Sequence, residues 1–186
     1  AVPGLIEALA DEENVVRVEA ARALRHIGDL DSLPMLIDAL RDPDGRVRRA
    51  VLDAVLVFKS AALDGLMDLL RDGSVVVKMS ALEALAQLGD ERAADHVVAL
   101  VKDKSPEIRV AAAAALGKMG RHRDVPVLIT LLDDKVKLPG KDMRVSDIAA
   151  SALSMFDDEA ARAALEKRRT REGKQMPPQR TGSAHE

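Results

Sequence analysis

The sequence predicts an all-α fold, a right-handed superhelix (α-solenoid) of about five helix pairs closed by a C-terminal capping helix. A short apolar block returns along the chain at an almost constant interval, and a second block with the apolar spacing of an amphipathic helix follows each copy. The composition agrees. Of the 186 residues 47% are hydrophobic but only 1% are aromatic, which favours helices packed through small side chains.

The first block opens each repeat. It reads VPGLIEALAD at 2–11 and LPMLIDALRD at 33–42, and it returns as LDGLMDLLRD, ADHVVALVKD and VPVLITLLDD. Pro3, Pro34 and Pro126 stand at its start, where a helix tolerates a missing N–H. We therefore predict a helix in each copy. The corresponding residues are separated by 31, 30, 31 and 31 positions: Leu5, Leu36, Leu66, Val97 and Leu128.

The second block predicts the other helix of each pair. It reads VRVEAARAL, VRRAVLDAV, VKMSALEAL, IRVAAAAAL and VSDIAASAL in successive copies. A rotation of 100° per residue places Val16, Ala20, Leu24 and Ile27 on one apolar stripe, which we expect to form the core face. One flank of the stripe holds an alanine in every copy, and there we expect neighbouring helices to approach too closely for larger side chains: Ala23, Ala54, Ala84, Ala115 and Ala152.

Glycine marks the end of the second helix. Gly28, Gly89 and Gly120 follow the second block, where a left-handed C-cap favours glycine. The second copy ends in Phe58, Lys59 and Ser60 instead, so we expect a different exit turn there.

The repeat has an acidic turn between the helices, followed by V-R-x-x-A-A-x-A-L and a closing Gly-Asp, as in residues 16–29. With this signature it resembles HEAT repeats. More narrowly, it resembles the short bacterial HEAT-like type that is also seen in phycobilin lyases. The resemblance covers about residues 1–158. It implies a ladder of hydrogen bonds between successive turns, which we assign to register because an exposed pair contributes only about 0–1 kcal/mol. The ladder residues are Asp11, Arg17, Asp42, Arg48, Asp72, Lys78, Asp103 and Arg109, and Ser146 interrupts the basic column.

The repeats divide the chain as follows. We predict a repeat domain over 1–172, with repeats at about 1–30, 31–60, 61–90, 91–121 and 122–158 and a capping helix at about 158–172. The fifth repeat inserts about six residues around 135–144, and Pro139 and Gly140 indicate an enlarged loop that either makes contacts or is a neutral insertion. Residues 173–186 are expected to form a disordered basic and polar tail. The chain begins at Ala1 inside a repeat, which suggests a piece of a longer protein.

Several kinds of chemistry are disfavoured. The chain has no cysteine, which excludes disulfides, thiolate metal sites and a cysteine nucleophile. Its four histidines show no metal-ligand spacing. HEAT-like deoxyhypusine hydroxylases have repeated His-Glu pairs, whereas here the pair occurs once, at His185 and Glu186. HEAT-like DNA glycosylases would need aromatic side chains, and the chain has no Trp or Tyr. We therefore expect neither catalysis nor a cofactor or metal.

The sequence instead favours a scaffold that binds a protein partner. In HEAT-like stacks the second helices line the concave surface, so the resemblance places the partner there. The candidate partner-binding residues are Arg22, Arg25, Arg49, Asp53, Met79, Glu83, Gln87, Lys118 and Asp147. We expect a cytoplasmic monomer without membrane insertion, since no apolar run approaches the roughly 20 residues of a membrane span.

Two alternatives stay open. One is a phycobilin lyase or isomerase like the enzymes whose repeats these resemble. The other is nucleic-acid association through the segment from Lys167 to Arg180, where six basic residues face only Glu172, a local charge of +5.

Overall fold

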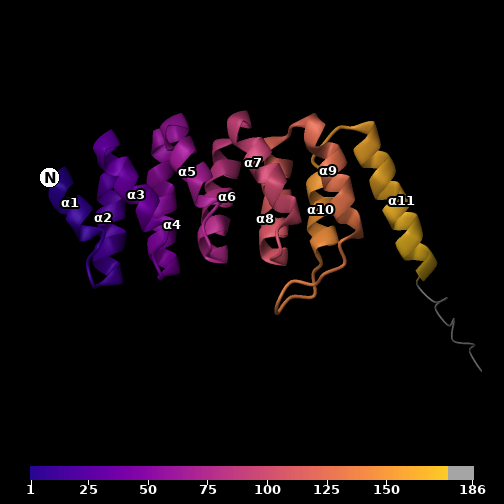
Figure 1. Ribbon diagram of the computed structural model, residues 1–186, viewed down its shortest axis with the longest axis horizontal. Coiled ribbons are helices and arrows are strands. Elements are labelled where there is room, and N and C mark those ends of the chain that lie inside the picture. Colours follow the sequence, from indigo (N-terminus) through magenta and orange to yellow (C-terminus); the bar gives the residue numbers. More distant parts are fainter. Residues whose placement is uncertain (176–186) are drawn as a thin grey trace, which may run out of the picture.

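The computed structural model describes residues 1–175, which form eleven α-helices with short 3₁₀ segments between them and no strand. Figure 1 shows the helices following one another in a row from α1 to α11. The helix pairs are α1 (Val2–Ala8) with α2 (Asn14–Ile27), α3 (Leu33–Ala39) with α4 (Gly45–Val55), α5 (Leu63–Leu69) with α6 (Val75–Leu88), α7 (Ala94–Ala99) with α8 (Pro106–Met119), and α9 (Val125–Thr130) with α10 (Val145–Leu153). The predicted all-α solenoid is confirmed.

The 3₁₀ segments connect or extend the helices. Four of them lead from a second helix into the next pair, and two follow α7 and α9. They are η1 (Leu30–Ser32), η2 (Leu56–Ala62), η3 (Glu91–Ala93), η4 (Leu100–Lys102), η5 (His122–Asp124) and η6 (Leu131–Asp133).

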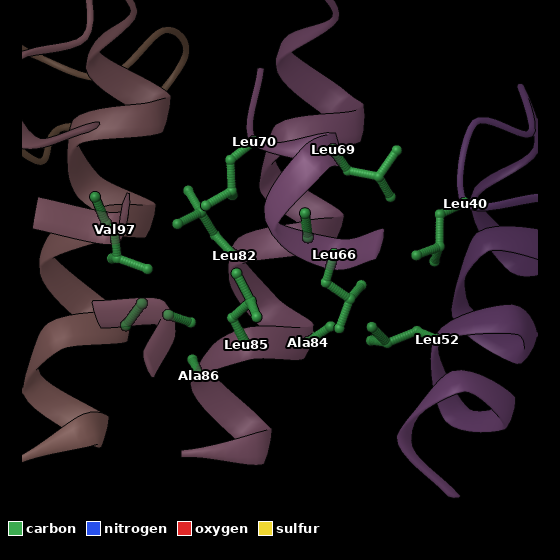
Figure 2. Close-up of a cluster of buried hydrophobic side chains, with 14 of the residues drawn as sticks. Leu40, Leu52, Leu66, Leu69, Leu70, Leu82, Ala84, Leu85, Ala86 and Val97 are labelled. Atoms are coloured by element: carbon green, nitrogen blue, oxygen red, sulfur yellow. The ribbon is translucent and has the colours of Figure 1, made fainter. Parts of the chain in front are cut away.

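One hydrophobic core runs along the stack, because each pair buries its apolar stripe against its neighbours. Figure 2 shows Leu66 of α5 between Leu40 and Leu52 of the second pair on one side and Leu82 and Leu85 of α6 on the other. Of these, Leu40, Leu66 and Leu85 are fully buried. The core is therefore shared between pairs.

The alanine flank behaves as expected in four of its five copies. Ala54, Ala84, Ala115 and Ala152 are buried, and α8 and α10 approach each other closely beside Ala152. A Cβ added at Gly117 would lie 3.0 Å from the Cβ of Ala152. The expectation is wrong only for Ala23, which is half-buried.

Ala23 belongs to the first pair, which packs against another pair on one side only. The same pair leaves Val16 39% exposed, whereas Val47, its equivalent in α4, is fully buried. Within residues 1–175 no further pair packs on this side of α1 and α2, and part of their apolar stripe is exposed to solvent.

The ends of the second helices follow the glycine pattern. Gly28, Gly89 and Gly120 are left-handed C-caps with φ of 65°, 65° and 69°. The exit turn of the second pair differs, as expected, because Lys59 stands in the glycine position with φ 50° and ψ −124°. This conformation favours glycine, so Lys59 holds the backbone under strain of about 1–3 kcal/mol.

The enlarged loop is a narrow hairpin that leaves α9 and returns to α10, projecting beyond the row of helices in Figure 1. Its arms are joined by backbone hydrogen bonds from Leu138 to Met143 (2.8 Å) and from Val145 to Val136 (3.1 Å). Leu138 is 8% exposed. The insertion therefore has a defined conformation.

The last helix, α11 (Glu159–Gln175), packs on α9 and α10 and buries Ala161. It was expected to end at about 172, and in the structure it continues to Gln175. Gly173 alone does not stop a helix, and an ion pair between Arg168 and Glu172 (2.8 Å) supports the last described turns. The rest of the expected tail, 176–186, lies outside the described residues.

Candidate functional site

Hydrogen bonds join the second helix of one pair to the turn of the next. The Nε atoms of Arg17 and Arg109 donate to Oδ2 of Asp42 and Asp134, both at 2.6 Å. Nζ of Lys78 donates in the same way to Oδ2 of Asp103 at 2.9 Å. The hydrogen bond to Asp42 raises the pKa of Arg17.

The arginines of this ladder also bind the turn of their own pair. Nη1 of Arg17 donates to the carbonyl oxygen of Asp11 at 2.8 Å, and Nη1 of Arg109 to that of Asp103 at 2.9 Å. One guanidinium therefore ties two successive turns together. The carboxylate of Asp11 accepts a hydrogen bond from the backbone N–H of Glu13 (2.8 Å).

The ladder is interrupted between the second and third pairs. Arg48 was expected to continue it, but its Nη1 donates only to the carbonyl oxygens of Asp42 (2.6 Å) and Pro43 (2.9 Å). Asp72 instead accepts from Nε of Arg41 (3.1 Å), which follows α3. At this junction α4 and α6 approach each other at few positions, whereas the other neighbouring second helices pack along their length.

The second helices line a groove of about 500 Å³ that crosses α4, α6 and α8. Its apolar lining includes Val76 and Met79, which are 45% and 41% exposed. Ala111 and Ala114 of α8 continue this lining, and Lys118 lies at the far end of α8. The groove therefore combines an apolar floor with charged edges.

Arg49 and Glu83 cross this groove. Nη1 of Arg49 donates to Oε1 of Glu83 at 2.8 Å and so links α4 to α6. Both side chains are about half exposed (60% and 45%), so this ion pair contributes at most about 1 kcal/mol. A partner could displace it at little cost.

A second groove, of about 530 Å³, lies between α2 and α4. Its lining includes Val15, Arg22, Arg25 and Asp53, and it shares Arg49 with the first groove. Arg22 pairs with Glu19 of its own helix (2.6 Å), and Arg25 has no ion-pair partner among residues 1–172. We call the two grooves together the second-helix face.

Two of the candidate residues lie elsewhere. Gln87 lines a separate hollow beside Lys59 and hydrogen-bonds Glu83 (3.4 Å). Asp147 lines neither groove. Its carboxylate instead accepts hydrogen bonds from the backbone N–H of Arg144 (2.8 Å) and from the guanidinium of Arg168 in α11. The structure therefore brings seven of the nine candidates together on the second-helix face.

The sequence did not single out a buried ion-pair cluster at the start of the fifth pair. Arg121, only 6% exposed, stands where Asp29 and Asp90 stand in earlier pairs. Its Nε donates to Asp124 (2.7 Å) and its Nη2 to Asp95 of the preceding pair (2.9 Å). The change from Gly-Asp to Gly-Arg was the available signal, and the compensated charges indicate a structural contact.

A family model described as HEAT repeats matches residues 2–75 and 63–139. The chain belongs to the HEAT-repeat family. Among solved structures, a designed armadillo repeat protein in complex with the peptide (KR)4 is 20% identical, with a TM-score of 0.53 over 92% of this chain and 89% of that one. A second designed armadillo repeat protein is also 20% identical, with a TM-score of 0.52 over 97% and 94%.

Human deoxyhypusine hydroxylase is 19% identical, with a TM-score of 0.46 over 89% of this HEAT-repeat chain and 77% of that protein. At these identities the likeness concerns the fold alone. No curated protein matches the chain.

Within residues 1–175 of this HEAT-repeat chain, no three His, Asp or Glu side chains converge as a metal site would require. None of the helices in these residues has both the length and the apolar character needed to cross a bilayer.

Proposed function

We propose that this HEAT-repeat protein is a non-catalytic scaffold that binds an extended segment of a protein partner along the second-helix face. The observation that supports this best is the continuity of the two grooves, which meet at Arg49. A surface that runs over four successive second helices suits an extended chain better than a compact ligand.

The chemistry of the grooves supports the same proposal. Val15, Val76 and Met79 are 63%, 45% and 41% exposed, so a bound segment would bury apolar surface that now faces water. The methionine side chain is flexible and adapts to different partners. The charges along the edges, including Arg25 and Lys118 without ion-pair partners among residues 1–172, would then select the partner's sequence.

A matched pair of substitutions tests this proposal. Met79→Asp places a carboxylate on the groove floor, and Met35→Asp places one on α3, where the side chain is similarly exposed (45%). Partners are captured with the full chain and identified by cross-linking and mass spectrometry. We expect Met79→Asp to lose the partner that cross-links to α6 and Met35→Asp to retain it. Retention by both variants, or loss by both, would refute binding at this face.

The other expectations remain predictions. No feature of the second-helix face favours a phycobilin lyase or isomerase, and the basic segment proposed for nucleic acid lies partly outside the described residues. The cytoplasmic location and the monomeric state are likewise untested.

A further inference from the structure

A small cleft lies at the C-terminal end of the stack, between α11, the end of α9 and the two ends of the enlarged loop. Its volume is about 180 Å³. Ile129, Leu132 and Ala164 supply the apolar part of its lining. The rest is strongly charged, with five basic and two acidic side chains: Lys135, Arg144, Lys167, Arg168, Arg171, Asp133 and Glu172. The loop and α11 each supply part of this set, so neither forms the cleft alone.

The two acidic residues are already paired. Glu172 accepts a hydrogen bond from Nε of Arg168 (2.8 Å), and Asp133 lies 3.4 Å from Nη1 of Arg171. Arg168 is held further by the carbonyl oxygen of Ser146 (2.6 Å), to which its Nη1 donates. This side chain is 17% exposed and therefore fixed in one orientation.

Three cations of the cleft have no such partner. Among residues 1–172, Lys135, Arg144 and Lys167 form no ion pair, and all three are exposed. Like charges brought together around one small volume repel each other, and an anion between them would remove that repulsion. The lining side chains thus carry a net charge of +3, and Asp147, which accepts a hydrogen bond from Arg168 beside the cleft, reduces the local net charge to +2.

We propose that this cleft binds a compact, multiply charged anion of the phosphate class. Three cations without a direct ion-pair partner exceed what one carboxylate neutralises, whereas phosphate groups offer several acceptor oxygens and more than one negative charge. The two lysines bind as point charges, and the Arg144 guanidinium can donate two parallel hydrogen bonds. The cleft shares no residue with the second-helix face, so the proposal stands apart from the peptide-binding function.

Calorimetric titration of the full chain with inorganic pyrophosphate at physiological salt tests this site. The variant Lys135→Gln/Lys167→Gln removes two unpaired cations, neither of which makes a hydrogen bond within residues 1–172 that folding would lose. The control variant Lys102→Gln/Lys104→Gln changes the net charge equally at another exposed position of the stack. We expect saturable binding by the natural chain, at least about tenfold weaker binding by the cleft variant and less than about twofold change in the control.

Two further measurements make the result decisive. Amide chemical shifts should change with pyrophosphate at the loop ends and along α11, and citrate, a carboxylate probe of comparable charge, should bind more weakly. The proposal is overturned if the natural chain shows no saturable pyrophosphate binding, if both double variants lose affinity equally, or if citrate binds as tightly as pyrophosphate.

Discussion

The close contact between the second helices α8 and α10 gives a quantitative test of the packing. Gly117 of α8 faces α10, where an added Cβ would lie 3.0 Å from the Cβ of Ala152, 3.1 Å from its Cα and 3.3 Å from Sδ of Met155. The Cα atom belongs to the backbone of a packed helix and cannot move aside cheaply. Replacing a helical glycine by alanine favours folding by about 1 kcal/mol, but overpacking opposes it by about 1–3 kcal/mol. The clash should win.

We therefore expect Gly117→Ala to lower the free energy of unfolding by about 1 kcal/mol, which corresponds to a fall of about 2–4 °C in Tm. Gly4→Ala in α1 is the matched control, since its Cβ would have no heavy atom within 4 Å and should raise stability by up to about 1 kcal/mol. Urea unfolding followed by circular dichroism measures both, with an unchanged m-value as the check on two-state behaviour. Equal stabilisation by the two substitutions would refute the close approach of α8 and α10.

Further predictions concern the strained turn, the ladder and pH. Lys59→Gly should raise the free energy of unfolding by about 1 kcal/mol because it relieves a positive φ. A Tm that does not rise in thermal unfolding would contradict this strain. Arg109→Gln should destabilise the protein by about 1–3 kcal/mol, and more than Arg48→Gln, because only Arg109 reaches the next pair; urea midpoints compare the two. Backbone and side-chain hydrogen bonds from neighbouring arginines lower the pKa of Asp44 and of Asp90 from 3.8 to about 2. The stability that these carboxylates contribute is present above about pH 4 and lost as pH falls toward 2, so Asp44→Asn should flatten the acid side of the stability profile.

The repeated part of the fold could be predicted because each pair meets the same neighbours. Leu36, Leu66 and Leu128 occupy equivalent positions and are all fully buried. The exceptions depend on contacts that the repeat does not contain. Asp147 lies at an outward position of α10, but its carboxylate binds the guanidinium of Arg168, which lies 21 residues further along the chain in α11. Leu5 occupies the position of a core residue yet is only half-buried, because among the described residues no further pair packs on the other side of the first pair.

The candidate site was predicted less completely, because helical periodicity identifies outward residues without showing which of them line a groove. Arg49, Met79 and Glu83 belong to one surface because α4, α6 and α8 lie side by side there. Gln87 lies on the same helix as Glu83, one turn later, and falls into a different hollow. Spacing along one helix could not separate these cases.

Three irregularities meet at the junction between the second and third pairs. The turn after α4 has Lys59 in place of glycine, Arg48 does not reach Asp72, and α4 and α6 approach each other at few positions. At the same junction the exposed Arg49–Glu83 pair takes the place of close packing between the two helices. The departure from the repeat therefore coincides with the part of the second-helix face where an exposed ion pair, rather than packed side chains, joins two neighbouring second helices.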